Sequence, residues 1–207
     1  MTLIQDQLTV AYADAPDLNY AYNHFEPRIH NTLIVTLPGR GYLNSHPMLH
    51  FIRMMCSQHE HDVLAIDYRF QQEPSGFEYK DMPTLIAETV QAIKQAAADY
   101  EEVVVVAKSL GTMIVPALVG EIPKLRALML TPIATSMADI GNTPALAIIG
   151  TDDAAYVPEK VHNSAIVTWQ VYEGLDHGLQ LKGNWAASLR VLGDILTQCE
   201  AFLFEEE

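Results

Sequence analysis

A short stretch near the middle of the chain constrains the fold more than any other. Four consecutive valines, at 103–106, run into the sequence Ala-Lys-Ser-Leu-Gly at 107–111. β-branched residues favour a strand, and a run that is apolar throughout predicts a strand buried on both faces. Small residues two positions before and two positions after Ser109 allow the chain to turn sharply there. We therefore expect a strand, a tight turn with the serine at its tip, and a helix over 113–119.

Segments with strand and helix character alternate along the rest of the chain. The segment 8–13 has the character of an early strand or of a piece of a hairpin. Strand character also occurs at 31–37, 62–67, 126–130, 145–149 and 166–172, and helical character at 46–58, 83–98 and 184–204. Most of these strands are continuously apolar, which predicts a mostly parallel sheet with helices on both faces. The fold class that we expect is α/β and doubly wound. Pro116 falls inside the helix after the serine, so that helix should be kinked or short.

The chain of 207 residues suits a single domain over 1–207. We find no internal repeat, low-complexity segment or linker that would divide it. The segment 131–143 between two late strands is too short to form a lid, so we expect no cap domain and an open site.

Charge narrows the kinds of molecule that this protein would bind, and cysteine content narrows the compartment in which it would work. The formal net charge is −14, which argues against nucleic acid or an anionic membrane surface as the partner. The N-terminal residues lack the basic and apolar pattern of an export signal. Cys56 and Cys199 lie far apart in the sequence, which favours two small core residues in a reducing compartment. We therefore expect a cytoplasmic protein whose partner is a small molecule.

Three residue types needed for nucleophilic catalysis each follow a predicted strand. A serine hydroxyl is a poor nucleophile near neutral pH unless a base lies within hydrogen-bond reach and a carboxylate orients that base. Ser109 follows the valine strand, an aspartate pair follows strand 145–149, and His177 follows strand 166–172. The carboxyl ends of parallel strands meet at one edge of a sheet, so these side chains should lie together there. The sequence predicts Ser109 as nucleophile and His177 as base.

The carboxylate that would orient the histidine has three candidates. The pattern Gly-x-x-Asp after strand 145–149 favours Asp153 over Asp152, without excluding the latter. Asp176 adjoins His177 in the sequence, and neighbouring side chains rarely point at one another. Asp176 therefore suits a turn-forming role better.

An acyl-transfer reaction also needs N–H donors directed at the developing oxyanion. The backbone N–H of Leu110, directly after the serine, is one candidate. The second is the N–H of Arg40 in the loop 38–42, where Gly39 and Gly41 allow close approach of the backbone to a substrate. Tyr42 and Arg69 are further candidates for substrate binding, and Arg40 or Arg69 would suit a substrate anion. Lys108 could face the site or turn away to pair with an acid such as Asp67.

Several short motifs in order carry a family resemblance. They are Pro-Gly-Arg-Gly-Tyr at 38–42, Asp-Tyr-Arg-Phe at 67–70, Lys-Ser-Leu-Gly-Thr at 108–112, Leu-Thr-Pro at 130–132, Gly-Thr-Asp-Asp at 150–153 and Asp-His-Gly-Leu at 176–179. Together they resemble the small, lidless, dienelactone-hydrolase-like branch of the α/β-hydrolase superfamily, over about residues 30 to 200.

The resemblance implies a Ser109–His177–Asp153 triad, oxyanion donors at Arg40 and Leu110, and no metal or organic cofactor. Ala107 replaces the first glycine that is common before the serine, and Pro38 stands where many relatives have histidine. Neither departure removes a catalytic group.

We therefore expect a serine hydrolase that cleaves a carboxylic ester or thioester of a small substrate. The main alternative is a catalytically silent protein of the same fold that binds a ligand. A metal site at His46 and His50 lacks a third ligand. Nucleotide binding at Gly39 and Gly41 lacks the third glycine, since Asn44 occupies its place, and leaves the triad unexplained. The sequence does not fix the oligomeric state.

Overall fold

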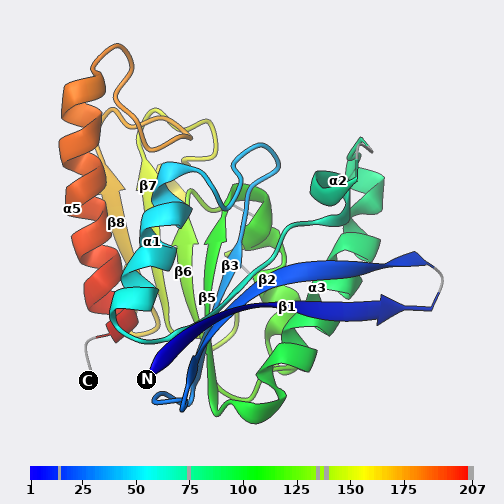
Figure 1. Cartoon of the computed structure of the whole chain (residues 1–207). Helices are drawn as coiled ribbons and strands as arrows, with labels where there is room; N and C mark the ends of the chain where they lie inside the picture. The colour runs from blue at the N-terminus through cyan, green and yellow to red at the C-terminus, as the bar shows by residue number, and fades with distance from the viewer. Residues whose placement is uncertain (14, 74–75, 134–135, 138–139, 205–207) are drawn as a thin grey trace.

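The computed structural model describes residues 1–13, 15–73, 76–133, 136–137 and 140–204 (Figure 1). One sheet of eight strands has the order β1-β2-β4-β3-β5-β6-β7-β8. Its strands are β1 (Thr2–Tyr12), β2 (Ala15–Glu26), β3 (Thr32–Leu37), β4 (Asp62–Ala65), β5 (Glu102–Lys108), β6 (Leu125–Leu130), β7 (Ala145–Gly150) and β8 (Val167–Tyr172). The six strands from β4 to β8 along this order pair in parallel, and the β1–β2 hairpin joins β4 antiparallel.

Helices cover both faces of the sheet, as the sequence predicts. The α-helices are α1 (Pro47–Gln58), α2 (Arg69–Gln72), α3 (Met82–Ala96), α4 (Val115–Leu118) and α5 (Trp185–Phe204), with 3₁₀ turns η1 (Tyr79–Asp81), η2 (Ala97–Asp99), η3 (Ser109–Met113) and η4 (Pro158–Lys160). Helices α1 and α5 pack into one apolar cluster, while α3 and α4 pack into a second cluster on the opposite face (Figure 1). The architecture is therefore a doubly wound α/β fold, with no cap domain in the part of the chain that the structure describes.

The valine run explains how the centre of the sheet is stabilised. Val103 and Val105 point into the cluster under α3, and Val104 and Val106 point into the cluster under α1 and α5. All four are buried, because successive side chains of a strand face opposite sides of the sheet. Strand β3 pairs with β5 in parallel, with Val35 opposite Val105. Both faces of this central pair are thus apolar.

The amino-terminal hairpin differs from the sequence expectation. The sequence predicts a strand or a piece of a hairpin at 8–13, and the structure has a complete hairpin there. Its first strand, β1, begins earlier, at Thr2, and the sequence analysis gives no range for its second strand, β2. Strand β2 contains Pro16 together with polar residues of low strand propensity, and Leu18, Tyr20 and Phe25 are its buried residues. A strand that pairs antiparallel needs only one apolar face, so its sequence pattern is weak.

The helix after the serine is short, in agreement with the effect predicted for Pro116. A 3₁₀ turn occupies Ser109–Met113, and α4 spans only Val115–Leu118, with Pro116 in its first turn. Proline lacks an N–H and is tolerated in the first turn of a helix, where that N–H would have no acceptor.

The two cysteines lie in the helices that share a face of the sheet. Cys56 of α1 and Cys199 of α5 are free thiols and are fully buried in the same apolar cluster. None of the described helices has the length and apolar content needed to cross a membrane.

Candidate active site

The site lies where the order of the strands reverses. The chain runs from β3 to β4 on one side and then crosses to β5 on the other side of β3. At such a point the loops that follow the two neighbouring strands diverge and leave a crevice at the carboxyl edge of the sheet. The loop 38–42 follows β3, and Ser109 follows β5. The topology therefore brings these two segments together.

Ser109 has an unusual backbone conformation that follows from the tight turn after β5. Its φ is +51°, in the left-handed region that non-glycine residues rarely adopt. Gly111 makes the turn possible, because a Cβ atom at this position would lie 2.5 Å from the carbonyl oxygen of Leu37. The hydroxyl of Thr112 donates to the Ser109 carbonyl at 2.6 Å and accepts the N–H of Ile133 at 3.1 Å. The turn is thus packed against β3 and hydrogen-bonded to the loop after β6.

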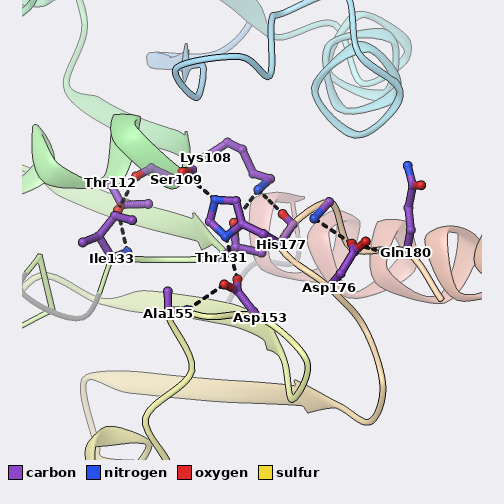
Figure 2. A network of polar contacts seen from close by, with 11 residues as sticks. Lys108, Ser109, Thr112, Thr131, Ile133, Asp153, Ala155, Asp176, His177 and Gln180 are labelled. Carbon is purple, nitrogen blue, oxygen red and sulfur yellow. Dashed lines mark hydrogen bonds and ion pairs between the residues drawn. The ribbon is translucent and has the colours of Figure 1, made fainter. Parts of the chain in front are cut away.

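Ser109, His177 and Asp153 form one hydrogen-bonded chain (Figure 2). The Nε2 atom of His177 lies 2.7 Å from Oγ of Ser109, and its Nδ1 atom lies 2.8 Å from Oδ2 of Asp153. The side chain of Asp153 is only 1% exposed, whereas that of His177 is 45% exposed. A carboxylate on Nδ1 selects the tautomer in which Nδ1 carries the proton and Nε2 is free to accept one.

The surroundings of Asp153 favour its ionised form. Burial raises the pKa of this carboxyl, but hydrogen bonds from His177 and from the Ala155 N–H, together with the nearby Lys108 charge, outweigh burial. The pKa of Asp153 consequently lies below its ordinary value. Of the other two candidates, Asp152 makes no hydrogen bond or ion pair with His177 in the part of the chain that the structure describes. Asp176 accepts the N–H groups of Gly178 and Gln180, as a turn-forming aspartate does.

The loop after β3 is held against Ser109 by residues that follow β4. Tyr68 donates its hydroxyl to the Pro38 carbonyl at 2.9 Å, and Gln71 donates its side-chain amide to the Gly39 carbonyl at 2.9 Å. A Cβ atom on Gly39 would lie 3.4 Å from the Cβ of Ser109, so the glycine itself packs beside the serine. Because the carbonyl and N–H of a trans peptide point in opposite directions, the N–H of Arg40 points away from Gln71.

The two predicted oxyanion donors are thereby available. Among the residues that the structure describes, no hydrogen bond occupies the N–H of Arg40. The N–H of Leu110 lies in the first turn of η3, where an N–H group has no acceptor within the helix.

Lys108 makes contacts that the sequence does not predict. Its side chain is 1% exposed, and its ammonium donates to the Thr131 hydroxyl and, at 2.7 Å, to the backbone carbonyl of His177 (Figure 2). It therefore pairs neither with Asp67, whose carboxylate accepts from Asn44, nor with another acid. Burial lowers the pKa of Lys108 to about 8, against the opposing charges of Asp153 and Asp176. One side chain thus links the serine turn, the loop after β6 and the histidine loop.

The predicted substrate-binding residues fall into different surroundings. Tyr42 lies 5.1 Å from the Lys108 ammonium, measured to the ring centroid, and its hydroxyl accepts the N–H of Met48. Gly41 is exposed, and a Cβ atom there would meet nothing. The Arg40 side chain turns to the carbonyl of Phe77 at 3.2 Å.

Arg69 is less suited to a substrate anion than the sequence suggests. Its guanidinium is paired with Glu88 at 2.7 Å and with Glu73 at 3.4 Å, so its charge is already balanced.

The histidines considered for a metal have other contacts. The Nδ1 atom of His46 accepts the N–H of Leu43, and His50 packs edge-on against Phe51. In the described part of the chain, no group of three or more His, Cys, Asp or Glu side chains is placed to hold a metal ion.

Two further features of the site are a packing role of Gly150, beyond its place in the Gly-x-x-Asp pattern, and strained backbone at two other residues. Gly150, at the end of β7, lies so close to the histidine loop that a Cβ atom there would be 2.0 Å from the Leu175 carbonyl oxygen. Thr131 and Leu179 share the positive φ of Ser109, with values of +46° and +60°. Strained backbone of this kind gathers at functional sites, but single residues do not reveal it in advance.

Comparison with known proteins identifies the architecture. No protein-family model matches the sequence, and a search of curated proteins finds no match. Among solved structures, a candidate α/β hydrolase from Agrobacterium tumefaciens has a TM-score of 0.73 at 14% identity, covering 96% of this chain and 94% of that one. An esterase from Pyrococcus furiosus has a TM-score of 0.69 at 14% identity, with coverage of 97% and 92%. An α/β serine hydrolase without a lid from Xanthomonas campestris has a TM-score of 0.65 at 15% identity, with coverage of 98% and 97%.

Proposed function

We propose that this chain, which has the α/β-hydrolase fold without a lid, is a serine hydrolase that cleaves carboxylic esters or thioesters of small substrates. The observation that carries the proposal is the unbroken hydrogen-bonded chain from the Ser109 hydroxyl through His177 to the buried carboxylate of Asp153. The esterase and hydrolase names of the similar structures support the reaction class at the level of fold. No metal or organic cofactor is part of the proposal.

The first half of the reaction would form an acyl-enzyme. The Oγ atom of Ser109 attacks the carbonyl carbon of the substrate while its proton passes to Nε2 of His177. Asp153 holds the imidazole in place and stabilises the imidazolium. The negative charge that develops on the carbonyl oxygen is bound by the N–H groups of Leu110 and Arg40, and one such donor contributes about 3 kcal/mol in favourable cases.

The second half would return the enzyme to its starting state. The tetrahedral intermediate collapses, and the alcohol or thiol leaves with the proton from His177 Nε2. Water then attacks the acyl-enzyme, giving its proton to the same nitrogen, and Ser109 regains a proton as the carboxylic acid departs. The side chain of His177 is 45% exposed, which is consistent with a water molecule reaching the imidazole.

The experiment that tests the proposal is intact-mass measurement after treatment with a fluorophosphonate. The wild type should gain one adduct and hydrolyse p-nitrophenyl acetate, and Ser109→Ala should do neither while keeping the wild-type melting temperature. A folded wild-type protein that takes up no adduct and hydrolyses no ester would instead support the silent, ligand-binding alternative.

The proposal includes a cytoplasmic location, for which two buried, unpaired thiols are the physical support.

A further inference from the structure

A groove lies beside the loop that carries His177 and is built mainly from apolar side chains. Its volume is about 730 Å³, within the range of pockets that bind small molecules. It runs between the start of α1, the loop after His177 and the start of α5. Its apolar walls are Pro47, Phe51, Leu181, Trp185, Leu189 and Leu192.

Three of these side chains are unusually exposed for their size. Trp185 is 78% exposed, Leu189 is 60% exposed and Phe51 is 44% exposed. Single exposed apolar residues are common, but several large ones around one hollow mark a surface that is covered when the protein works. Among the described residues that line the groove, Asp176 and Lys182 are the only charged ones, although the chain as a whole carries a net charge of −14.

The groove lies beside the reacting groups, although neither Ser109 nor His177 lines it. Asp176 and Gly178, which flank His177 in the sequence, form part of its lining, as does Tyr42. Gly39 connects Tyr42 to the nucleophile, since a Cβ atom on it would lie 3.2 Å from the Tyr42 Cβ and 3.4 Å from the Ser109 Cβ. A substrate with its scissile carbonyl beside Ser109 and an apolar chain attached to it could therefore lay that chain in the groove.

We propose that the groove binds an aliphatic chain of the substrate, so that the enzyme prefers esters or thioesters carrying a medium-length alkyl chain. The inference rests on the proposed function and adds the chemical class of its substrate. An apolar chain suits walls that offer large side chains and few charges. The position of the groove, which shares Asp176 and Gly178 with the histidine loop and Tyr42 with the loop beside Ser109, favours the substrate itself over a second copy of this protein.

Chain-length dependence is the first test. We would measure kcat/KM for p-nitrophenyl esters from acetate to decanoate, and for alkyl acetates with the same chain on the alcohol side. Burial of one methylene corresponds to about a 4-fold gain when complete, so about 2-fold per partly buried methylene predicts roughly a 50-fold gain from acetate to octanoate. A gain in either series supports the proposal and identifies which side of the ester enters the groove. Equal rates along both series would overturn it.

Variants locate the effect. Trp185→Ser and Leu189→Ser should lower kcat/KM for the long ester about 5- to 20-fold and leave p-nitrophenyl acetate within 2-fold of the wild type. Ile29→Ser is the matched control. Ile29 is 50% exposed, but it precedes β3 and so lies at the amino end of that strand, whereas the site lies at the carboxyl ends of the strands. If all three variants behaved alike, the preference would not come from the groove.

A binding measurement separates this inference from the proposed function. In a Ser109→Ala, Trp169→Phe background, Trp185 is the remaining tryptophan, and decanoate below its critical micelle concentration should shift its emission to the blue. Acetate should cause no such shift.

A shift in a protein whose wild type hydrolyses no ester would leave the groove intact and refute the hydrolase. Hydrolysis of acetate with no shift and no chain-length preference would refute the groove alone. A dimer that Trp185→Ser dissociates, with no such preference, would make the groove an interface between copies and likewise overturn the proposal.

Discussion

At the scale of single residues, the two neighbouring aspartates after β7 should differ sharply in importance. Asp153→Asn removes the acceptor that fixes the His177 tautomer, so kcat for an ester substrate should fall roughly 10⁴-fold. Asp152→Asn leaves the 2.8 Å contact between His177 and Asp153 untouched and should keep the wild-type rate. Steady-state kinetics on the two purified variants decides between them. Equal loss in both, or greater loss in Asp152→Asn, would contradict the assignment of Asp153.

Residues that could be predicted from the sequence share a simple positional signal. Ser109, Asp153 and His177 each follow an apolar strand, and a parallel sheet necessarily gathers such positions at one edge. Lys108 carries no comparable signal. Its long, flexible side chain reaches the His177 carbonyl only because of how the folded chain packs. The pairing of Arg69 with Glu88 is equally unreadable, since the two residues are brought together by α2 and α3 only in the folded chain.

At the scale of elements, the end of β7 and the histidine loop should tolerate no added atom between them. Gly150→Ala places a methyl carbon 2.0 Å from the Leu175 carbonyl oxygen, so β7 and the loop must separate. We expect a loss of about 1–3 kcal/mol in the free energy of unfolding, together with reduced ester hydrolysis, because both His177 and Asp153 adjoin this contact. Urea denaturation followed by tryptophan fluorescence measures the first effect.

Gly193→Ala is the control for that substitution. Gly193 lies in α5, and a Cβ atom there meets nothing within 4 Å. Alanine should therefore stabilise the protein by about 0.5–1 kcal/mol, as expected for a helix interior. A destabilisation of equal size at both glycines would show that close packing at Gly150 is not the cause.

Some helices and strands can be predicted from their sequence much better than others. The parallel strands and the helices α1, α3 and α5 lie within a few residues of the predicted ranges, because burial on both faces or along one stripe leaves a strong apolar pattern. Strand β2 was missed for the opposite physical reason. Its exposed face is polar, and its hydrogen bonds to β1 and β4, which the local sequence does not encode, determine its conformation.

At the scale of the whole molecule, the buried ammonium of Lys108 should make stability depend on pH in an uncommon direction. Its pKa is about 8 in the folded protein and 10.5 when unperturbed. Between these values the unfolded chain binds more protons than the folded one, so the free energy of unfolding contributed by Lys108 rises with pH. Below pH 8 both states are protonated, and the contribution no longer changes.

Comparison with Lys108→Met isolates this contribution from that of the tyrosines. From pH 8 to pH 10, the unfolding free energy of the wild type minus that of the variant should increase, by up to about 1.4 kcal/mol per pH unit. Urea denaturation at half-unit intervals of pH provides the measurement. A difference that stays constant or falls over this range would mean that Lys108 titrates normally in the folded protein.

The two free thiols allow the opening of helices α1 and α5 to be measured by alkylation. Cys56 and Cys199 are fully buried in the cluster that α1 and α5 share, and burial raises the pKa of both thiols, that of Cys56 to about 12. A thiol in this state reacts with a maleimide only after its helix has moved away from the sheet. The rate of alkylation in native buffer therefore reports how often α1 and α5 move away from the sheet. The starts of the same two helices form walls of the apolar groove.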